Sequence, residues 1–308
     1  MSINYKTNGI IKIILLPLFM AILMTQASAS ILEVGEGQEY SHIQDAVNNA
    51  NEGDKVIVHS GIYEENVILD KQIILQGVGS PIIDGMGVGN SLSLYAESLV
   101  VDGFVLCNGR SGSYVVSDNN ILTNNTFKGN QYGVYLFGSK GNVIEQNVIE
   151  HNQRYGVYLL FKSDNNIITD NMINNNGGGI RIISSDDNKL YLNSIIENVV
   201  ISNGNNQWDD GVDKGNHYSF FDEESEGFID KDHDDVSDVP YKIPVKNEVD
   251  NYPLASIGST RPTIVLVKEN PIEPSKETSE EIPEFPTVAF PILLLMGIFV
   301  VFNKKTNS

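Results

Sequence analysis

The sequence is poor in cysteine and in positive charge. Its only cysteine is Cys107, so an internal disulfide and a cysteine-based zinc site are both excluded. We expect Cys107 to be a small, buried core residue. There are 20 Lys and Arg against 40 Asp and Glu, for a formal net charge of -20. Because nucleic-acid binding needs a basic surface that neutralises phosphates, we predict no nucleic-acid partner.

A long apolar run is also missing, and two short ones lie near the ends of the chain. The first follows Lys6 and runs from Ile10 to Met24, and Ala-Ser-Ala stands after it at 27–29. Such a run before a small-residue cleavage site predicts a signal peptide over residues 1–29. The alternative is a permanent N-terminal anchor.

The second apolar run follows an acidic, Pro-containing stretch, 259–282. Pro-Glu-Phe-Pro stands at 283–286, apolar residues occupy 287–302, and Lys304 and Lys305 come after them. Residues 283–308 resemble the PEF-CTERM sorting signal of methanogenic archaea, which implies processing by an archaeosortase-like enzyme. Without the resemblance, the same residues predict one transmembrane helix with the lysines inside the cell. Either way we expect an exported protein, anchored to the membrane at the cell surface with its body outside.

Between Asn120 and Val200 the sequence repeats itself, with a period of about 22 to about 24 residues that indicates a repeat architecture. The unit is too short and too rich in Asn and Gly for a helical hairpin, and its apolar residues alternate as in strands. We therefore predict an all-β, right-handed parallel β-helix over residues 30–203, whose rungs pair at about 4.8 Å. The core should include Ile144, Ile149, Ile168 and Ile173. The repeated asparagines should be scaffold, placed at left-handed turn positions with their side chains in ladders: Asn120, Asn142, Asn166 and Asn188, then Asn125, Asn147, Asn171 and Asn193.

Both ends of the predicted β-helix need a cover. Residues 40–47 predict a short capping helix at the first rung, and residues 204–258 an acidic C-terminal cap. The opening from residue 31 resembles the pectin-lyase-like β-helix families. The repeats and the cap together resemble the NosD-like proteins of methanogens, although His217, Tyr218, Phe220 and Phe221 replace four residues of that family's usual cap segment, Gly-Asn-Tyr-Trp-Ser-Asp-Tyr.

The NosD resemblance implies copper, because such proteins are often labelled copper-binding. Copper sites use clustered imidazole, thiolate or thioether groups. The histidines are scattered, at 42, 59, 151, 217 and 233, and no such cluster is visible in the sequence.

Tyrosines recur at one strand position of consecutive repeats. Tyr-Gly-Val-Tyr stands at 132–135 and at 155–158, and Gly-Gly-Ile-Arg at 178–181. If Val134, Val157 and Ile180 point inward, then the residues that follow them point outward on three successive rungs. These outward residues are Tyr135, Tyr158 and Arg181. Such a stack suits sugar rings, through apolar contacts and directed hydrogen bonds. The alternative is that the tyrosines only stabilise one another across the rungs.

The acidic cap contains a candidate calcium loop. Carboxylates at loop positions 1, 3, 5 and 9, with a main-chain carbonyl at position 7, have the spacing of an EF-hand-type loop. Asp235 stands where the sharp turn prefers Gly, and Tyr241 where a bidentate Glu would complete the shell, so we expect weak binding. The alternative is a merely solvated acidic loop. The predicted ligands are Asp230, Asp232, Asp234, Asp238 and the carbonyl of Val236.

Catalysis would need acid, base or metal groups that converge on one face. The repeat alignment places Glu145 beside Thr169 and not beside Asp170, so no catalytic residue is predicted. We therefore predict an envelope binding or structural module, with surface polysaccharide or envelope proteins as partners and glycan as its ligand. Two alternatives stay open: a carbohydrate-active enzyme (polysaccharide lyase, epimerase or hydrolase) on the same fold, and a NosD-type copper accessory protein.

Overall fold

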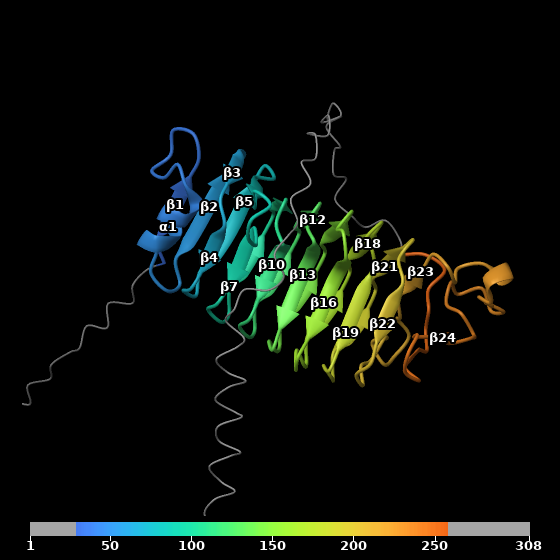
Figure 1. The fold of residues 1–308 in the computed structure, drawn as a ribbon. Coiled ribbons are helices and arrows are strands. Elements are labelled where there is room, and N and C mark those ends of the chain that lie inside the picture. The colour runs from blue at the N-terminus through green and yellow to red at the C-terminus, as the bar shows by residue number, and fades with distance from the viewer. Residues whose placement is uncertain (1–28, 258–308) are drawn as a thin grey trace, which may run out of the picture. The chain divides into compact units, whose positions relative to one another are not determined.

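The strands of this chain wind into a parallel β-helix (Figure 1). The structure, a computed structural model, describes residues 29–257. The predicted signal peptide up to residue 28, the stalk and the sorting signal lie outside the described residues. Within 29–257 we find no helix of the length and apolar character needed to span a membrane.

Three parallel sheets form the sides of the β-helix, and in each sheet the strands follow one another in chain order. Sheet 1 contains β1 (Ile31–Val34), β2 (Lys55–His59), β5 (Ile74–Val78), β8 (Val100–Asp102), β11 (Ile121–Thr123), β14 (Val143–Glu145), β17 (Ile167–Thr169) and β20 (Lys189–Tyr191). Sheet 2 contains β3 (Ile62–Glu64), β6 (Ile82–Asp84), β9 (Val105–Cys107), β12 (Thr126–Lys128), β15 (Val148–Glu150), β18 (Met172–Asn174), β21 (Ser194–Ile196) and β23 (His217–Tyr218). Sheet 3 contains β4 (Val67–Leu69), β7 (Leu92–Leu94), β10 (Ser111–Val115), β13 (Tyr132–Phe137), β16 (Tyr155–Leu160), β19 (Ile180–Ile183) and β22 (Val200–Ser202).

The ends of the β-helix are covered by different structures. Helix α1 (Ile43–Asn49) buries Ile43, Ala46 and Val47 at the N-terminal end, which confirms the predicted capping helix. At the other end, β23 extends sheet 2 into the predicted cap. The cap also holds a short 3-10 helix, η1 (Glu224–Glu226), and an antiparallel pair, β24 (Tyr241–Lys242) and β25 (Val249–Asp250).

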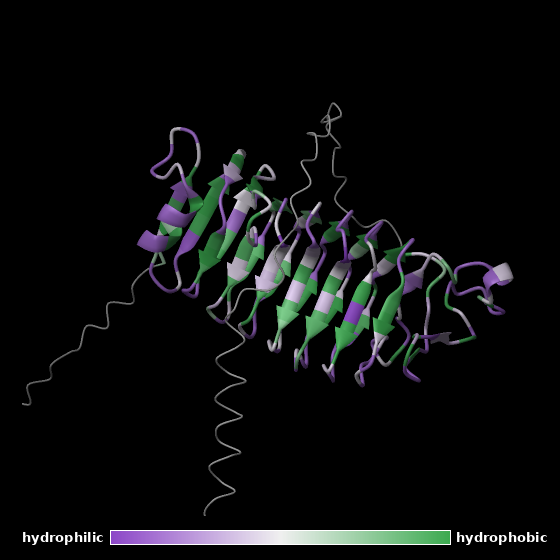
Figure 2. Cartoon of the chain, in the orientation of Figure 1, coloured by the Kyte–Doolittle hydropathy of each residue, from purple (hydrophilic) through white to green (hydrophobic). Residues whose placement is uncertain are grey.

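Apolar side chains stack inside the β-helix, one rung upon the next. Ile149 lies between Phe127 and Ile173 of the neighbouring rungs, and all three are fully buried. Burying such a side chain stabilises the fold by about 1.5–3 kcal/mol. Figure 2 shows the apolar residues on the strands and the polar residues mostly in the turns. The four predicted core residues are confirmed as buried: Ile144, Ile149, Ile168 and Ile173.

The rung length is regular only in the middle of the β-helix. Strand pairing there joins Leu122 to Ile144 and Ile144 to Ile168, the same spacing as in the repeated asparagines. At the N-terminal end, Val56 pairs with Leu75 and Leu75 with Val101, so a short rung is followed by a long one. The predicted period therefore holds where the repeat is visible in the sequence, and the first rungs depart from it.

The repeated asparagines form buried ladders at the corners. In most steps the backbone N–H and the Nδ2–H of one asparagine donate to the Oδ1 of the next: Asn142 donates to Asn166 over 2.9 and 3.0 Å. The ladders were predicted, but the left-handed position was placed wrongly. It belongs to the preceding residue, such as Asn165 (φ 58°) before Asn166, because that turn directs the following asparagine side chain inward.

Two of these ladders end on carboxylates of the cap. The first ends where Asn206 N–H donates to Glu248 (2.9 Å), whose other oxygen accepts from the indole N–H of buried Trp208. The second ends where Asn216 N–H donates to Asp250 (2.7 Å). Burial raises the pKa of Asp250 to about 7, although the hydrogen bonds that it accepts oppose this shift. A carboxylate suits this place, because the ladder presents only donors to it.

Cys107 differs from its prediction. It lies at an outward position of β9, paired with Asp84 and Lys128 on the neighbouring rungs, and it is half-buried. Residue 106 takes the inward position instead, since Leu106 is fully buried.

Candidate functional site

A cluster of aromatic side chains covers the outer side of sheet 3. The repeated Tyr-Gly-Val-Tyr segment explains it. Gly133 follows the corner of the rung and faces inward, where an added Cβ would lie 2.6 Å from the side chain of Ile149. Val134 also points inward. The chain therefore turns both flanking tyrosines, Tyr132 and Tyr135, outward, and the neighbouring rings leave Tyr132 only 8% exposed.

Strand pairing stacks these tyrosines across the rungs as predicted. Tyr135 pairs with Tyr158, and Tyr158 pairs with Arg181. The rings of Tyr135 and Tyr158 lie parallel, 5.0 Å apart with an interplanar angle of 22°. Tyr114, on the rung before, packs edge-on against Tyr135 at 5.4 Å.

A second column of tyrosines lies beside the first, at the corner with sheet 2. Tyr132 stacks on Tyr158 at 5.5 Å, and Tyr155 contacts the same ring at 5.5 Å. On the opposite edge, Phe137 and Phe161 stack at 5.7 Å and are 38% and 59% exposed. We call the whole set the aromatic face: Tyr114, Tyr132, Tyr135, Phe137, Tyr155, Tyr158 and Phe161.

Two arginines are fixed against the aromatic face. Arg181 donates a hydrogen bond to the hydroxyl of Tyr155 and lies over its ring, 5.2 Å from the centroid. Arg154 donates to the hydroxyl of Tyr132 over 3.2 Å. An arginine has five N–H donors, so each guanidinium keeps most of its donors for other partners.

Tyr135 and Tyr158, the two central tyrosines, stay uncharged at ordinary pH. Burial, and then the neighbouring tyrosines, raise the pKa of Tyr135 to about 12. Burial raises the pKa of Tyr158 as well, although Arg181 opposes that shift. These hydroxyls can therefore donate as well as accept hydrogen bonds.

The sequence predicted three of the residues found here and missed the others. Tyr135, Tyr158 and Arg181 come together as expected. Tyr114 could have been found, since Ser113-Tyr114-Val115 fits the same strand position one repeat earlier. Tyr132 and Tyr155 could not, because simple alternation places them on the same side of the strand as the inward valines.

The predicted calcium loop brings three carboxylates together. Side-chain oxygens of Asp230, Asp232 and Asp234 lie within 4.8 Å of one another. Asp230 also accepts the backbone N–H groups of the fourth, fifth and sixth loop residues, His233, Asp234 and Asp235, over 2.7 to 3.3 Å. The sharp turn forms without glycine, since Asp235 adopts a φ of 66°.

The charges in this loop act on one another. The neighbouring charge of Asp234, then partial burial and the charge of Asp238, raise the pKa of Asp232. Burial acts to raise the pKa of Asp230 as well, but the backbone hydrogen bonds outweigh it and the pKa is lowered.

The remaining predicted ligands stand near the loop in different ways. Asp238 accepts the N–H of Lys231 over 2.9 Å, and the N–H of Val236 donates to Asp234. Asp250, another acid of the cap, is buried and accepts hydrogen bonds from Asn216 and Tyr218.

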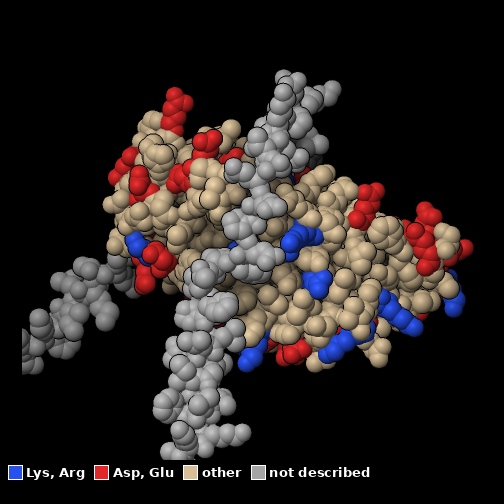
Figure 3. Space-filling view, viewed as in Figure 1, with Lys and Arg blue, Asp and Glu red and all other residues tan. Residues whose placement is uncertain are grey.

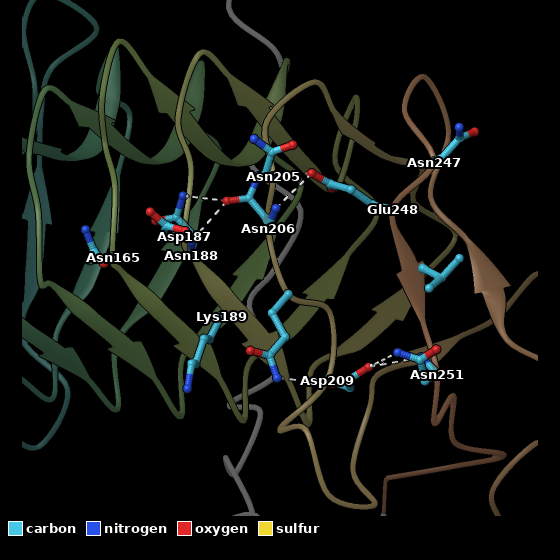
Figure 4. Close-up of a pocket in the computed structure, with 12 residues that line it drawn as sticks. Asn165, Asp187, Asn188, Lys189, Asn205, Asn206, Asp209, Asn247, Glu248 and Asn251 are labelled. Carbon is cyan, nitrogen blue, oxygen red and sulfur yellow. Dashed lines mark hydrogen bonds between the residues drawn. The ribbon is translucent and has the colours of Figure 1, made fainter.

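A polar hollow of about 760 Å³ lies where the last rungs meet the cap (Figure 4). Amide and carboxyl side chains line it, and several of them bond to one another: Asn206 to Glu248, and Asn251 to Asp209. None of the predicted site residues lines it. Its polar groups therefore serve mainly to join the cap to the β-helix.

The strand register rules out Glu145 and Asp170 as a catalytic pair of carboxylates on adjacent rungs. Glu145 pairs with Thr169 across β14 and β17, as the repeat alignment indicated. Asp170 occupies the following left-handed turn (φ 55°).

Comparison with known proteins gives one family, one relative in sequence and several similar structures. Residues 47–213 match the family model described as periplasmic copper-binding protein (NosD). A cell surface glycoprotein of Methanothermus fervidus is 26% identical over 187 residues, which are 48% of this chain and 32% of that protein. The chain thus spans about a third of that relative's length.

Three solved structures are similar at 12% identity. Pectate lyase Pel9A matches with a TM-score of 0.40 over 62% of this chain and 74% of its own. A pectin methylesterase from Aspergillus niger matches with a TM-score of 0.33 over 61% and 88%. An alginate lyase from a Paenibacillus species matches with a TM-score of 0.32 over 58% and 95%.

Proposed function

This chain belongs to the NosD family, and from that premise we propose that it is an exported cell-surface protein whose aromatic face binds polysaccharide. The observation that carries the proposal is the continuous column of half-exposed tyrosines over consecutive rungs, flanked by fixed arginines. Contiguous aromatic surface of this kind is typical of ligand-binding sites.

Two further points support this location and role. The cell surface glycoprotein of Methanothermus fervidus is a relative over about half of this chain. The predicted signal peptide and residues 283–308 fit export and retention at the membrane, by an archaeosortase-like enzyme or by a transmembrane helix.

The family's copper label does not fit the residues present. Within 29–257, the one group of three or more His, Cys, Asp or Glu side chains able to converge on an ion is the aspartate cluster of the cap, which offers only oxygen. Copper prefers imidazole and sulfur ligands. Four histidines instead lie beside four separate carboxylates: His42 by Glu65, His59 by Glu33, His151 by Glu150 and His217 by Asp222.

The proposal is tested by removing the two central rings. In affinity gel electrophoresis against soluble neutral and acidic polysaccharides, the wild-type protein should be retarded by at least one polymer. Tyr135→Ala with Tyr158→Ala should abolish the retardation, because both rings of the central column are lost while the inward residues remain. The fold should stay intact by circular dichroism.

The matched control removes two aromatic rings elsewhere. Tyr191 lies in sheet 1, and Phe220, 55% exposed, lies in the cap. Tyr191→Ala with Phe220→Ala should bind as the wild type does. If the Tyr135 and Tyr158 double variant also binds as the wild type does, the tyrosines are purely structural and the proposal is wrong.

We also propose that the loop 230–238 binds calcium, which would offset the mutual repulsion of its carboxylates and stiffen the cap. Titration calorimetry should give a dissociation constant in the range of about 10⁻⁴ to 10⁻³ M, typical of extracellular calcium modules. Asp230→Ala with Asp232→Ala should abolish the calcium heat, because two of the three clustered carboxylates are gone.

The control for this titration changes two exposed acids outside the loop, Asp70→Ala with Asp213→Ala. That variant loses the same charge and should retain binding. Absence of calcium heat at millimolar concentration in the wild type, or equal binding in both variants, would leave only a solvated acidic loop.

A further inference from the structure

The charge of this acidic protein is reversed around its aromatic face. Four segments form the sheet 3 side of four consecutive rungs: 109–117, 131–139, 152–163 and 175–185. They contain no Asp or Glu. Their four basic residues are Arg110, Arg154, Lys162 and Arg181.

The other two sides of the same rungs have the opposite charge. The intervening segments, 118–130, 140–151, 164–174 and 186–198, hold eight acids and three lysines, a formal charge of -5 against +4 on the sheet 3 side. Figure 3 views the sheet 3 side: Lys and Arg lie over the middle of the β-helix, and most of the visible Asp and Glu lie toward its ends. In a chain of net charge -20, such a separation within single rungs is not a result of composition.

The positive charge at the face consists chiefly of arginine. All three arginines between residues 29 and 257 belong to these segments. Lys140, just outside them, is paired with Asp164 at 3.1 Å. Guanidinium groups are planar, bind carboxylate and sulfate oxygens in pairs, and stack on aromatic rings, which an ammonium group does less well.

The arginines reach different parts of the aromatic column. Arg110 is close enough to Tyr114 and Tyr135 to oppose the rise in their pKa, and Arg154 and Arg181 act in the same way on Tyr158. Positive charge therefore accompanies the rings on three of the four rungs, which are spaced at about 4.8 Å, and Gln131 takes the equivalent position between Arg110 and Arg154. A neutral polysaccharide would need the rings and hydroxyls but not this repeated charge.

We infer that the ligand of the aromatic face is an acidic polysaccharide, a linear chain whose carboxylate or sulfate groups contact Arg110, Arg154 and Arg181 while its sugar rings lie on the tyrosines. This inference rests on the proposed function of the face and adds the chemical class of its ligand. The acid-free surface avoids the repulsion that such a chain would meet on the other two sheets.

The experiment compares polymers that differ only in charge. Polygalacturonate is paired with its carboxyl-reduced form, and dextran sulfate with dextran, by affinity electrophoresis of the full-length protein. The wild type should bind at least one acidic polymer about tenfold more tightly than its neutral partner, and added salt should weaken that binding. The polymer that binds tells whether carboxylate or sulfate is preferred.

The variants test whether the arginines are responsible. Arg110→Gln, Arg154→Gln and Arg181→Gln together should weaken binding to the acidic polymer about tenfold or more, since three charge-assisted contacts are lost. Lys128→Gln, Lys189→Gln and Lys242→Gln remove the same charge from other surfaces and should bind as the wild type does. Thermal melting confirms that both variants are folded.

The outcomes separate this inference from the function on which it rests. Equal binding of the neutral and acidic polymers, unaffected by the arginine substitutions, would overturn the acidic ligand and leave polysaccharide binding in place. Tighter binding of single-stranded DNA than of any polysaccharide would overturn it as well. No binding to any polymer would overturn both.

Discussion

Replacing Ile149 with aspartate is expected to prevent the β-helix from folding. The side chain of Ile149 is fully buried in β15, between Phe127 and Ile173, and the inward-facing Gly133 lies against it. A carboxylate at this place would have no cation and no water. An unpaired buried charge costs several kcal/mol, a large share of the roughly 5–15 kcal/mol that stabilises a typical domain.

The neighbouring position provides the control. Val148 lies in the same strand but points outward, so Val148→Asp introduces the same residue into solvent. Far-ultraviolet circular dichroism and urea unfolding should show a stable β-structure for Val148→Asp and little or none for Ile149→Asp. An Ile149→Asp variant as stable as Val148→Asp would show that residue 149 does not face the core, and the register of β15 would be wrong.

The repeat explains why so much of this fold could be predicted. Each rung has the same contacts as its neighbours, so one spacing in the sequence determines the pairing of Ile144 with Ile168 and of Tyr135 with Tyr158. The first rungs, one short and the next long, lack the asparagines that would mark their corners. Their length was therefore not predictable from the repeat.

The errors come from places where the chain bends. Strict alternation assumes a straight strand, but at the corner between sheets 2 and 3 the inward Asn is followed within a few residues by an inward Gly. Because the glycine points inward as well as the valine after it, the tyrosine just before the glycine points outward. Tyr132 and Tyr155 therefore lie on the outer side of the sheet. Three of the five tyrosines on the aromatic face were missed for this reason or through an overlooked repeat.

The C-terminal ends of the ladders show a second limit. Glu248 lies 42 residues beyond Asn206, and Asp250 lies 34 residues beyond Asn216. The segment between them has no repeat that would give its register. Only the folded cap shows that Glu248 and Asp250 accept the last hydrogen bonds of the ladders. Asp230 and Asp232, by contrast, lie in the loop with Asp234.

Loss of one asparagine from the middle of a ladder is expected to destabilise the protein nearly as much as a charge in the core. Asn171 accepts from the N–H and the Nδ2 of Asn147, both over 3.0 Å. It donates to the carbonyls of Ile144 (2.7 Å) and Thr169 (2.9 Å) and to Oδ1 of Asn193 (3.0 Å). Asn171→Ala leaves these groups in a buried corner without partners. At about 1–3 kcal/mol for each unsatisfied group, the free energy of unfolding should fall by roughly 3–6 kcal/mol.

Asn174 provides a matched control within three residues of Asn171. Its side-chain Oδ1 is buried and has no hydrogen-bond partner, so Asn174→Ala removes an unsatisfied group and should change stability by less than about 1 kcal/mol. Asn171→Asp distinguishes the hydrogen bonds that Asn171 accepts from those that it donates. The carboxylate keeps the acceptor for Asn147 but sets a negative charge against three oxygens, so this variant should be less stable than Asn171→Ala. Urea unfolding of the three variants measures their order of stability. A small effect of Asn171→Ala would show that water can replace the hydrogen bonds of the ladder.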